Sequence, residues 1–223
     1  MSAPLPTLEE ACRSTENPTV ANALTCIEHG EREIKRSSSQ NPRYPVELID
    51  VVVLPGRGRV TIRPILSQDD TVTQAFFAAM SRESRHNRFL RNLRELPDAL
   101  LRQFTQVDYK THLALIAEIF SGSREIAVGE ARYVVSPDGK SAEFAVSIAD
   151  EWQGCGLGSL LLARLIAAAK KAGIETITGE TLASNRAMLH LAQKAGFTHA
   201  FDPEIRGLVN LNLSLAGHGQ ALI

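Results

Sequence analysis

The sequence predicts a single α/β domain built around a mixed β-sheet of about six or seven strands, preceded by a flexible N-terminal tail. Two observations carry this prediction. Strand-like and helix-like hydrophobic patterns alternate along the chain from about residue 43 onward. The 223 residues also suit one domain of about 150 to 200 residues plus a tail.

Residues 1–42 stand apart from this domain. Four prolines interrupt them, and the run from Ser37 to Pro42 is typical of a linker. Residues 20–35 could form one short helix. We expect a mobile or weakly docked tail, with a partner-binding or regulatory arm as the alternative. The domain is then expected to cover residues 43–216, and residues 217–223 to form a loose C-terminus.

Hydrophobic periodicity and turn residues predict the elements of the domain. Ser67 and Ser184 are the expected N-caps of two helices, and Gly196 the expected stop of the second. The predicted strands are 46–54, 60–64, 112–119, 125–135, 141–148, 176–182 and 206–215, and the predicted helices are 67–80, 97–106, 157–172 and 184–194.

Five arginines recur at steps of three after the first helix. On a helix this spacing falls about 60° short of a turn, so the side chains would wrap around most of the circumference. We expect most of them to be solvated or paired with Glu83 and Glu95, while one or two could reach a bound phosphate or an acidic partner. The five are Arg82, Arg85, Arg88, Arg91 and Arg94.

Bulk composition excludes several functions. A net charge of −1 gives no support for general nucleic-acid binding. No apolar run approaches the roughly 18 residues of a membrane span, and no signal peptide is visible. The three cysteines form no Cys-x-x-Cys pair, so neither a disulfide framework nor a zinc site is expected. A reducing cytoplasm is the expected location.

The glycine-rich segment that joins the strand at 141–148 to the next helix is the strongest functional signal. It reads Gln153-Gly154-Cys155-Gly156-Leu157-Gly158. Glycines in alternate positions allow a ligand to approach the main chain, and the helix N-terminus behind them offers free amides to a phosphate or pyrophosphate. A dinucleotide fingerprint would need a glycine at Ser159, although Glu175 and Glu180 lie near the distance expected for a ribose-binding acid. The sequence has no Gly-Lys-Ser/Thr motif, which argues against a P-loop.

The segment matches Gln/Arg-x-x-Gly-x-Gly/Ala, and further motifs follow the same family in order. The chain therefore resembles the GCN5-related N-acetyltransferase (GNAT) superfamily, in particular the C-terminal acetyltransferase domain of bacterial protein-lysine acetyltransferases that modify acyl-CoA synthetases. The large synthetase-like domain that often precedes it there is missing from this sequence. The motifs, which span roughly residues 44 to 215, are Tyr44-Pro45, Arg63-Pro64-Ile65, Ser81–Arg85, Arg88-Phe89, Thr105–Tyr109, Ala142–Ala145, Asn185–Leu189 and Gly196-Phe197.

The resemblance implies a GNAT fold and an acyltransferase that uses acetyl-CoA and no metal. The implied acceptor is a protein lysine, with an acyl-CoA synthetase as one candidate and a small amine as another; no nucleic-acid or membrane partner is implied, and the oligomeric state stays open. The residues implied in acetyl-CoA binding are Val146, Ser147, Ile148, Gln153, Gly154, Cys155, Gly156, Leu157, Gly158, Ser159, Asn185 and Met188. Asn185 could instead cap its helix, Met188 could be core, and the Cys155 side chain is expected to be incidental.

Glu143 is the expected general base. A free lysine has a pKa of about 10.4, so transfer to it needs a group that removes a proton. Glu143 lies on the strand before the glycine segment among apolar neighbours, where burial would raise its pKa. The family's catalytic glutamate occupies a similar Ala-Glu-apolar strand. A surface or salt-bridged carboxylate is the alternative.

One position departs from the family. Ala192 stands where many members carry a tyrosine that protonates the departing thiolate. Water could supply that proton, or Tyr109, Tyr133 or His190 could substitute.

Direct transfer to a protein lysine in a ternary complex is the leading interpretation of the sequence. A small-amine acetyltransferase, a CoA-binding regulatory module without turnover and a dinucleotide-binding oxidoreductase are the alternatives.

Overall fold

The computed structural model describes residues 43–91 and 93–216. The predictions made for residues 1–42 and 217–223 lie outside this range. Within it, no helix is both long enough and apolar enough to cross a membrane.

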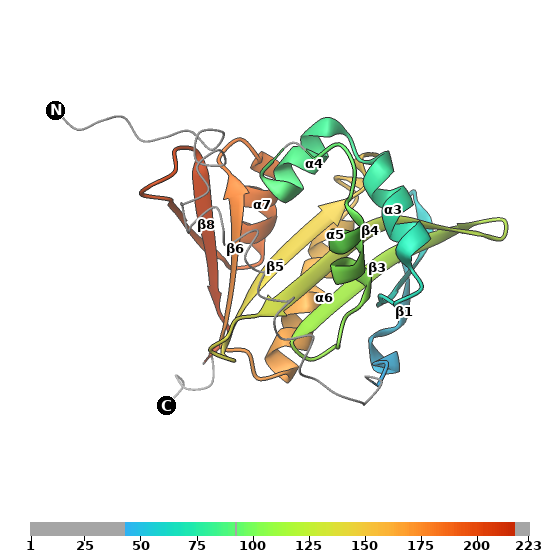
Figure 1. The fold of residues 1–223 in the computed structure, drawn as a ribbon, viewed down its shortest axis with the longest axis horizontal. Helices are drawn as coiled ribbons and strands as arrows, with labels where there is room; N and C mark the ends of the chain where they lie inside the picture. Colours follow the sequence, from blue (N-terminus) through green and yellow to red (C-terminus); the bar gives the residue numbers. More distant parts are fainter. Residues whose placement is uncertain (1–42, 92, 217–223) are drawn as a thin grey trace.

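The described chain forms one mixed sheet of eight strands in the order β1-β2-β3-β4-β5-β6-β8-β7 (Figure 1). All neighbouring strands pair antiparallel except β5 and β6, which are parallel. The α/β class and the mixed sheet are therefore confirmed. The strands are β1 Asp50–Leu54, β2 Gly58–Pro64, β3 His112–Ser121, β4 Arg124–Val135, β5 Ser141–Ile148, β6 Thr176–Leu182, β7 Thr198–Phe201 and β8 Leu208–Ser214.

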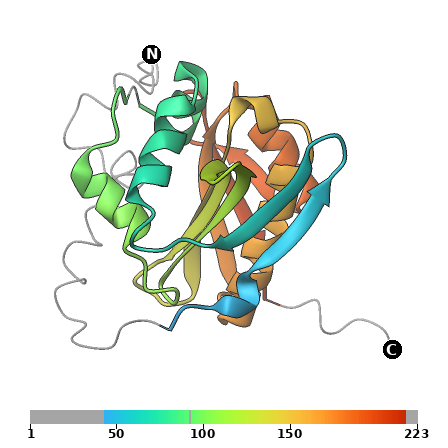
Figure 2. The ribbon, with the colours of Figure 1, turned by 90° about the vertical axis from the view of Figure 1, so that its right-hand side faces the viewer.

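Two layers of helices cover the sheet, one on each face (Figure 2). On one face lie α3 (Asp70–Ala79), α4 (Arg82–Phe89) and α5 (Asp98–Thr105). On the other lie α6 (Leu157–Lys171) and α7 (Arg186–Lys194). The main core forms between the sheet and this second layer, where the α6 side chains Leu157, Leu161, Leu162 and Leu165 are fully buried.

Strand β5 contributes to both faces because its side chains alternate. Ala142, Phe144 and Val146 enter the core on the α6 side. Glu143 and Ser147 therefore point to the opposite face, beneath α3, α4 and α5. The strand thus separates an apolar layer from a face that carries carboxylates.

Several predicted boundaries were wrong, each for a local reason. Residues Val46–Leu48 form a 3₁₀ turn (η1) instead of strand, closed by the Leu48 amide donating to the Pro45 carbonyl at 3.0 Å. The first helix begins at Asp70 and not at Ser67, because the Asp69 carboxylate accepts from the Leu66 amide at 2.7 Å and folds 66–69 into a turn.

Helix α4 was not predicted, and further differences lie near the C-terminus. Helix α7 begins after Asn185 instead of Ser184, because the Asn185 Oδ1 accepts from the Met188 amide at 3.1 Å. Strand β7 was not predicted. It has four residues, all exposed, so it lacks the alternation of apolar and polar side chains by which strands are detected.

Candidate active site

Strands β5 and β6 pair over three residues and then part. Their register joins Ser141 to Thr176, Ala142 to Ile177 and Glu143 to Thr178, and the described ladder between them ends there. Both strands continue, β5 to Ile148 and β6 to Leu182. Beyond Glu143 the main chain of β5 therefore borders a gap in the sheet, and Figure 1 shows the two strands diverging.

The backbone of β5 presents polar groups to this gap. The Ser136 amide donates to the Ser141 carbonyl at 2.8 Å and the Ala149 amide to the Val128 carbonyl at 3.0 Å, which fixes the odd-numbered residues of β5 as those bonded to β4. The amides and carbonyls of Phe144, Val146 and Ile148 consequently face β6. An extended ligand with amide groups could pair with this edge as an added strand does.

The glycine segment follows at the end of β5 and opens α6. Gly154 and Gly156 adopt φ angles of 72° and 90°, a left-handed conformation that favours glycine. Gly156 is the N-cap of α6, and the first amides of a helix have no intrahelical partner. Leu157 is fully buried and belongs to the main core, which anchors the start of α6 against the sheet. Gly158 and Ser159 lie on the first turn of α6, half-buried.

The side chain of Gln153 holds the segment in place. Its Nε2 donates to the Ile148 carbonyl at 3.2 Å and lies 3.3 Å from the Ser84 Oγ and 3.4 Å from the Asp150 Oδ1. The predicted binding residue Gln153 thus connects the end of β5, the turn and α4. Its side chain therefore stabilises the loop.

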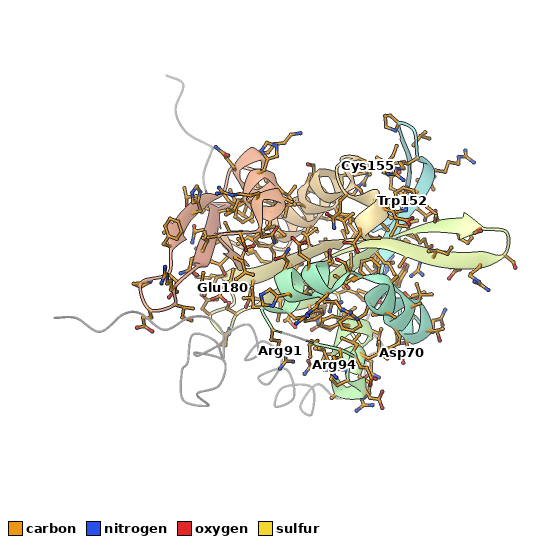
Figure 3. The ribbon with its side chains drawn as sticks, turned by 90° about the horizontal axis from the view of Figure 1, so that it is seen from above. Asp70, Arg91, Arg94, Trp152, Cys155 and Glu180 are labelled. Atoms are coloured by element: carbon orange, nitrogen blue, oxygen red, sulfur yellow. The ribbon has the colours of Figure 1, made fainter. Side chains whose placement is uncertain are left out.

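Trp152 directly precedes the same segment and Cys155 lies within it, both on the α6 side of the sheet (Figure 3). The Arg57 guanidinium lies over the Trp152 ring, 5.4 Å from its centroid. The Cys155 Sγ donates to the Trp152 carbonyl at 2.9 Å. The thiol therefore has a local structural contact, in keeping with its expected incidental role.

Asp150 ties α4 to the start of this segment. Its carboxylate accepts from the Ser81 amide at 2.7 Å, the Ser81 hydroxyl at 2.9 Å and the Ser84 hydroxyl at 2.5 Å. These serines form the first turn of α4, where Ser81 is the N-cap. The pKa of Asp150 is lowered, since the hydrogen bonds from Ser84 and Ser81 outweigh its partial burial. An ionised carboxylate at a helix N-terminus is favourable, so α4 and the glycine segment are held together.

Glu143 lies half-buried at the point where β5 leaves β6, on the face below α4. The charge of Arg88, from α4, acts on it. Glu180, on β6 and the same face, also interacts with it. Burial first, then the charges of Glu143 and Asp202, raise the pKa of Glu180 to about 7. The structure thus places the predicted base beside a second carboxylate that titrates near neutral pH.

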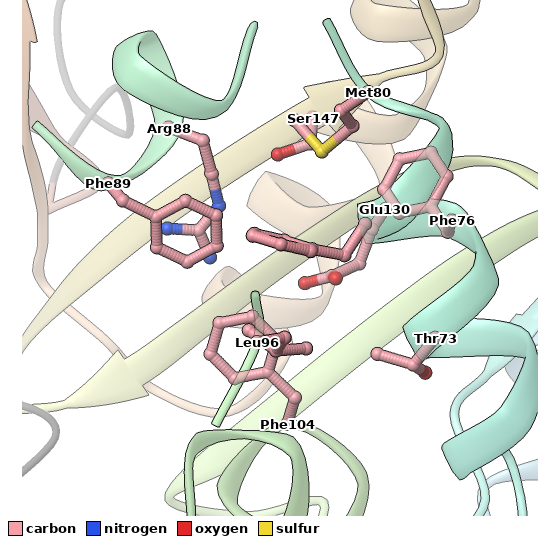
Figure 4. A pocket seen from close by; sticks show the side chains of 10 residues that line it. Thr73, Phe76, Met80, Arg88, Phe89, Leu96, Phe104, Glu130 and Ser147 are labelled. Carbon is pink, nitrogen blue, oxygen red and sulfur yellow. The ribbon is translucent and has the colours of Figure 1, made fainter. Parts of the chain in front are cut away.

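Arg88 is an exception to the expectation that most of the five arginines are solvated or paired with Glu83 and Glu95. Its guanidinium lies 5.0 Å from the Phe89 ring centroid and 5.4 Å from that of Phe104. With Glu130 and Ser147 it lines a small pocket between α3, α4, α5 and the sheet (Figure 4). Burial is the largest influence on Arg88 and lowers its pKa to about 10, a value at which the side chain stays charged at neutral pH.

The remaining predicted residues are divided between the two faces of the sheet. Val146 is buried in the core on the α6 side, and Ser147 lines the aromatic pocket, so their side chains point to opposite faces. Met188 packs against the main core. Asn185 caps α7, which is the alternative role considered for it.

The position that carries tyrosine in many relatives offers no hydroxyl. Ala192 is buried in the core at 1 % exposure. Of the substitutes, Tyr109 donates its hydroxyl to the Ile65 carbonyl at 2.8 Å, and His190 is exposed on α7. Tyr133 is buried in the core at 1 % exposure, and burial raises its pKa to about 12.

The fold and the family comparison together define an acyltransferase of the GNAT class. Residues 59–198 match the family model for the acetyltransferase (GNAT) domain, and the chain belongs to that family. The N-acetyltransferase resemblance, the fold and the assignment as an enzyme are thereby confirmed.

Two bacterial acetyltransferases are similar to this chain in sequence. An acetyltransferase of Pseudomonas aeruginosa is 34% identical over 145 residues, which cover 65% of this chain and 78% of that protein. Acetyltransferase Pat of Mycolicibacterium smegmatis is 29% identical over 136 residues, 60% of this chain but 40% of Pat.

Among solved structures, the GNAT domain of S. lividans PAT superposes with a TM-score of 0.70 at 28% identity, covering 78% of this chain and all of that domain. A Salmonella typhimurium protein solved with its cofactor acetyl-CoA shares the fold, with a TM-score of 0.57 at 23% identity over 72% of this chain and 96% of that one.

Proposed function

We propose that this protein transfers the acetyl group of acetyl-CoA to a primary amine, a lysine of another protein, by direct transfer in a ternary complex with Glu143 as general base. One observation carries the proposal: β5 leaves β6 at Glu143, between a backbone edge that can hold a ligand and a face that holds carboxylates. Donor and acceptor would then approach Glu143 from opposite sides of the sheet.

The donor side fits an acyl-CoA. The left-handed glycines at 154 and 156 expose the N-terminus of α6, which suits a pyrophosphate. The Val146 and Ile148 backbone groups suit the amides of a pantetheine arm. The fold shared with the Salmonella protein that carries acetyl-CoA supports the choice of acetyl-CoA as donor.

The acceptor side fits an amine. As the C–N bond forms, the nitrogen must lose a proton, and the Glu143 carboxylate can take it. Breaking the C–S bond leaves a thiolate with a pKa of about 8.5, which water can protonate, as Ala192 supplies no hydroxyl. The motifs shared with protein-lysine acetyltransferases and the superposition on the whole of the S. lividans domain favour a protein acceptor. We place donor and acceptor in the cytoplasm and name an acyl-CoA synthetase as the first acceptor to test.

The test compares wild type, Glu143→Gln and Glu175→Gln with labelled acetyl-CoA, using a purified acyl-CoA synthetase and a panel of free amines. Glu175 is a matched control because it is half exposed and pairs with Lys140 at 3.2 Å. We expect Glu143→Gln to lower turnover by roughly 10²- to 10⁴-fold with acetyl-CoA affinity retained, and Glu175→Gln to behave as wild type.

Rapid, Glu143-dependent labelling of one synthetase lysine supports the proposal. Saturable turnover of a free amine without protein labelling above the Glu143→Gln background would replace the protein acceptor with a small amine. Wild-type turnover by Glu143→Gln would remove Glu143 as the base.

A further inference from the structure

Glu180 lies next to Glu143 across the point where β5 and β6 part. Glu143 pairs with Thr178, and Glu180 follows two residues later on β6. Residues two apart on a strand share a face, so Glu180 is the diagonal neighbour of Glu143 on the face below α4. Glu180 is also half-buried.

The charges around the two carboxylates differ. The Arg88 guanidinium of α4 lies near Glu143. The same guanidinium also interacts with the charges of Glu130 and Arg132 on β4. The charges that act on Glu180 are those of Glu143 and Asp202, both negative. An ionised form is therefore favoured at Glu143 by a cation and disfavoured at Glu180 by two anions.

Asp202 is a fixed negative charge in this arrangement. Its carboxylate accepts from the amides of Glu204 and Ile205 at 2.9 and 2.8 Å and from the Asn210 side chain at 3.0 Å. These hydrogen bonds outweigh its partial burial and lower its pKa. Asn210 is the register partner of Glu180 between β6 and β8, but its side-chain amide donates its hydrogen bond to the Asp202 carboxylate.

We propose that Glu143 and Glu180, diagonal neighbours on one face of β5 and β6, act as one coupled carboxylate pair, with Glu180 as the positioning residue that sets the base strength of Glu143. The inference rests on the proposed role of Glu143 as base. It adds to that role a second residue on the neighbouring strand. The separation of β5 from β6 then decides how strongly the two carboxylates interact.

The transfer step balances with this pair. The amine nitrogen gives its proton to the ionised Glu143 as the C–N bond forms, and the C–S bond breaks to leave a thiolate that takes a proton from water. Glu143 then returns its proton to solvent, while Glu180 keeps the one with which it began. When Glu180 ionises above about pH 7, its negative charge makes Glu143 a stronger base.

The first experiment follows the glutamate carboxyl carbons by ¹³C NMR against pH in the full chain, without substrate. The Glu180 signal is assigned with Glu180→Gln. In the wild type it should titrate near pH 7, and in Glu143→Gln its midpoint should fall by roughly one pH unit because a like charge has been removed. Glu175→Gln, the matched control, should leave it in place. A Glu180 midpoint that does not move in Glu143→Gln would overturn the pair.

The second experiment measures kcat and KM for the amine acceptor between about pH 5.5 and 9. This range extends to both sides of pH 7, near which the Glu180 carboxyl titrates. Glu180→Gln should match the wild-type kcat below about pH 6 and fall several-fold behind it above pH 7.5, and Glu180→Asp should restore part of the difference. A constant ratio at every pH would reduce Glu180 to a structural residue.

The two failures are distinguishable. If Glu143→Gln acetylates at the wild-type rate, the proposed base is wrong, whatever the NMR titration gives. If Glu143→Gln is inactive but the Glu180 midpoint does not move, the base stands and the pair is refuted.

Discussion

At the scale of single residues, the two carboxylates of Glu143 and Glu180 lie in different electrostatic environments. Arg88 faces Glu143, whereas Asp202 and Glu143 itself face Glu180. Such a separation commonly marks acid and base roles in active sites. It also has a cost in stability, because a buried carboxyl that must ionise destabilises the folded state.

This cost predicts a pH-dependent effect of Glu180→Gln. The folded protein keeps the Glu180 proton up to about pH 7, while the unfolded chain releases it near 4.5. The unfolded state therefore binds fewer protons between these values, and the wild-type free energy of unfolding falls as pH rises through this window. Urea unfolding at pH 8 should find the variant more stable by up to about 3 kcal/mol, and at pH 4.5 nearly equal to wild type. A variant less stable than wild type at pH 8 would contradict the raised pKa.

At the scale of elements, the proposed donor site lies at the junction of β5, the glycine segment and α6. Gly156 caps α6 with a φ of 90°, and a Cβ built there would meet nothing within 4 Å. The protein itself leaves this space open, so a side chain added here would enter the volume in which a pyrophosphate is expected. A carboxylate would add like-charge repulsion.

We therefore expect Gly156→Asp to abolish acetyl-CoA binding while the chain still folds. The matched control is Gly173→Asp, at the other end of α6. Gly173 has a φ of 82° and equally open surroundings, so both variants bear a similar backbone cost of about 1 to 2 kcal/mol. Calorimetry should detect binding by wild type and Gly173→Asp and none by Gly156→Asp. Equal affinity in all three proteins would place the pyrophosphate elsewhere.

At the scale of the whole molecule, three residue pairs between β5 and β6 join a five-stranded half of the sheet to a three-stranded half. A ligand that lies along this line contacts both halves. It should stabilise the fold as a whole, because binding to the native state alone adds RT ln(1 + [L]/Kd) to the free energy of unfolding.

Acetyl-CoA at 100 times its Kd should thus contribute about 2.7 kcal/mol and raise the Tm by roughly 5 to 10 °C. Differential scanning fluorimetry with acetyl-CoA, CoA and NAD tests this. The same shift with NAD and none with acetyl-CoA would favour the dinucleotide interpretation that the missing glycine at Ser159 argues against.

The sequence was sufficient for elements with strong periodicity and insufficient for contacts between distant segments. The boundaries of β6 and the start of α6 follow from alternation, helical spacing and the glycines, and the structure confirms them. The burial of Arg88 was missed because it depends on Phe104, which a different helix supplies. The near-neutral pKa of Glu180 was missed because its main cause is burial in the folded chain, followed by the charges of Glu143 and Asp202. Asp202 lies in a turn beyond β7, a strand too short and exposed to predict.

The contact between Arg57 and Trp152 has an optical consequence. Trp152 is the single tryptophan of the chain, and its indole lies under a guanidinium immediately before the glycine segment. Indole emission shifts with the charges and solvent around the ring, and a polyanion that arrives beside Arg57 changes both. The protein therefore carries its own fluorescent reporter beside the proposed donor site, and in the unlabelled chain its tryptophan emission comes from that one position.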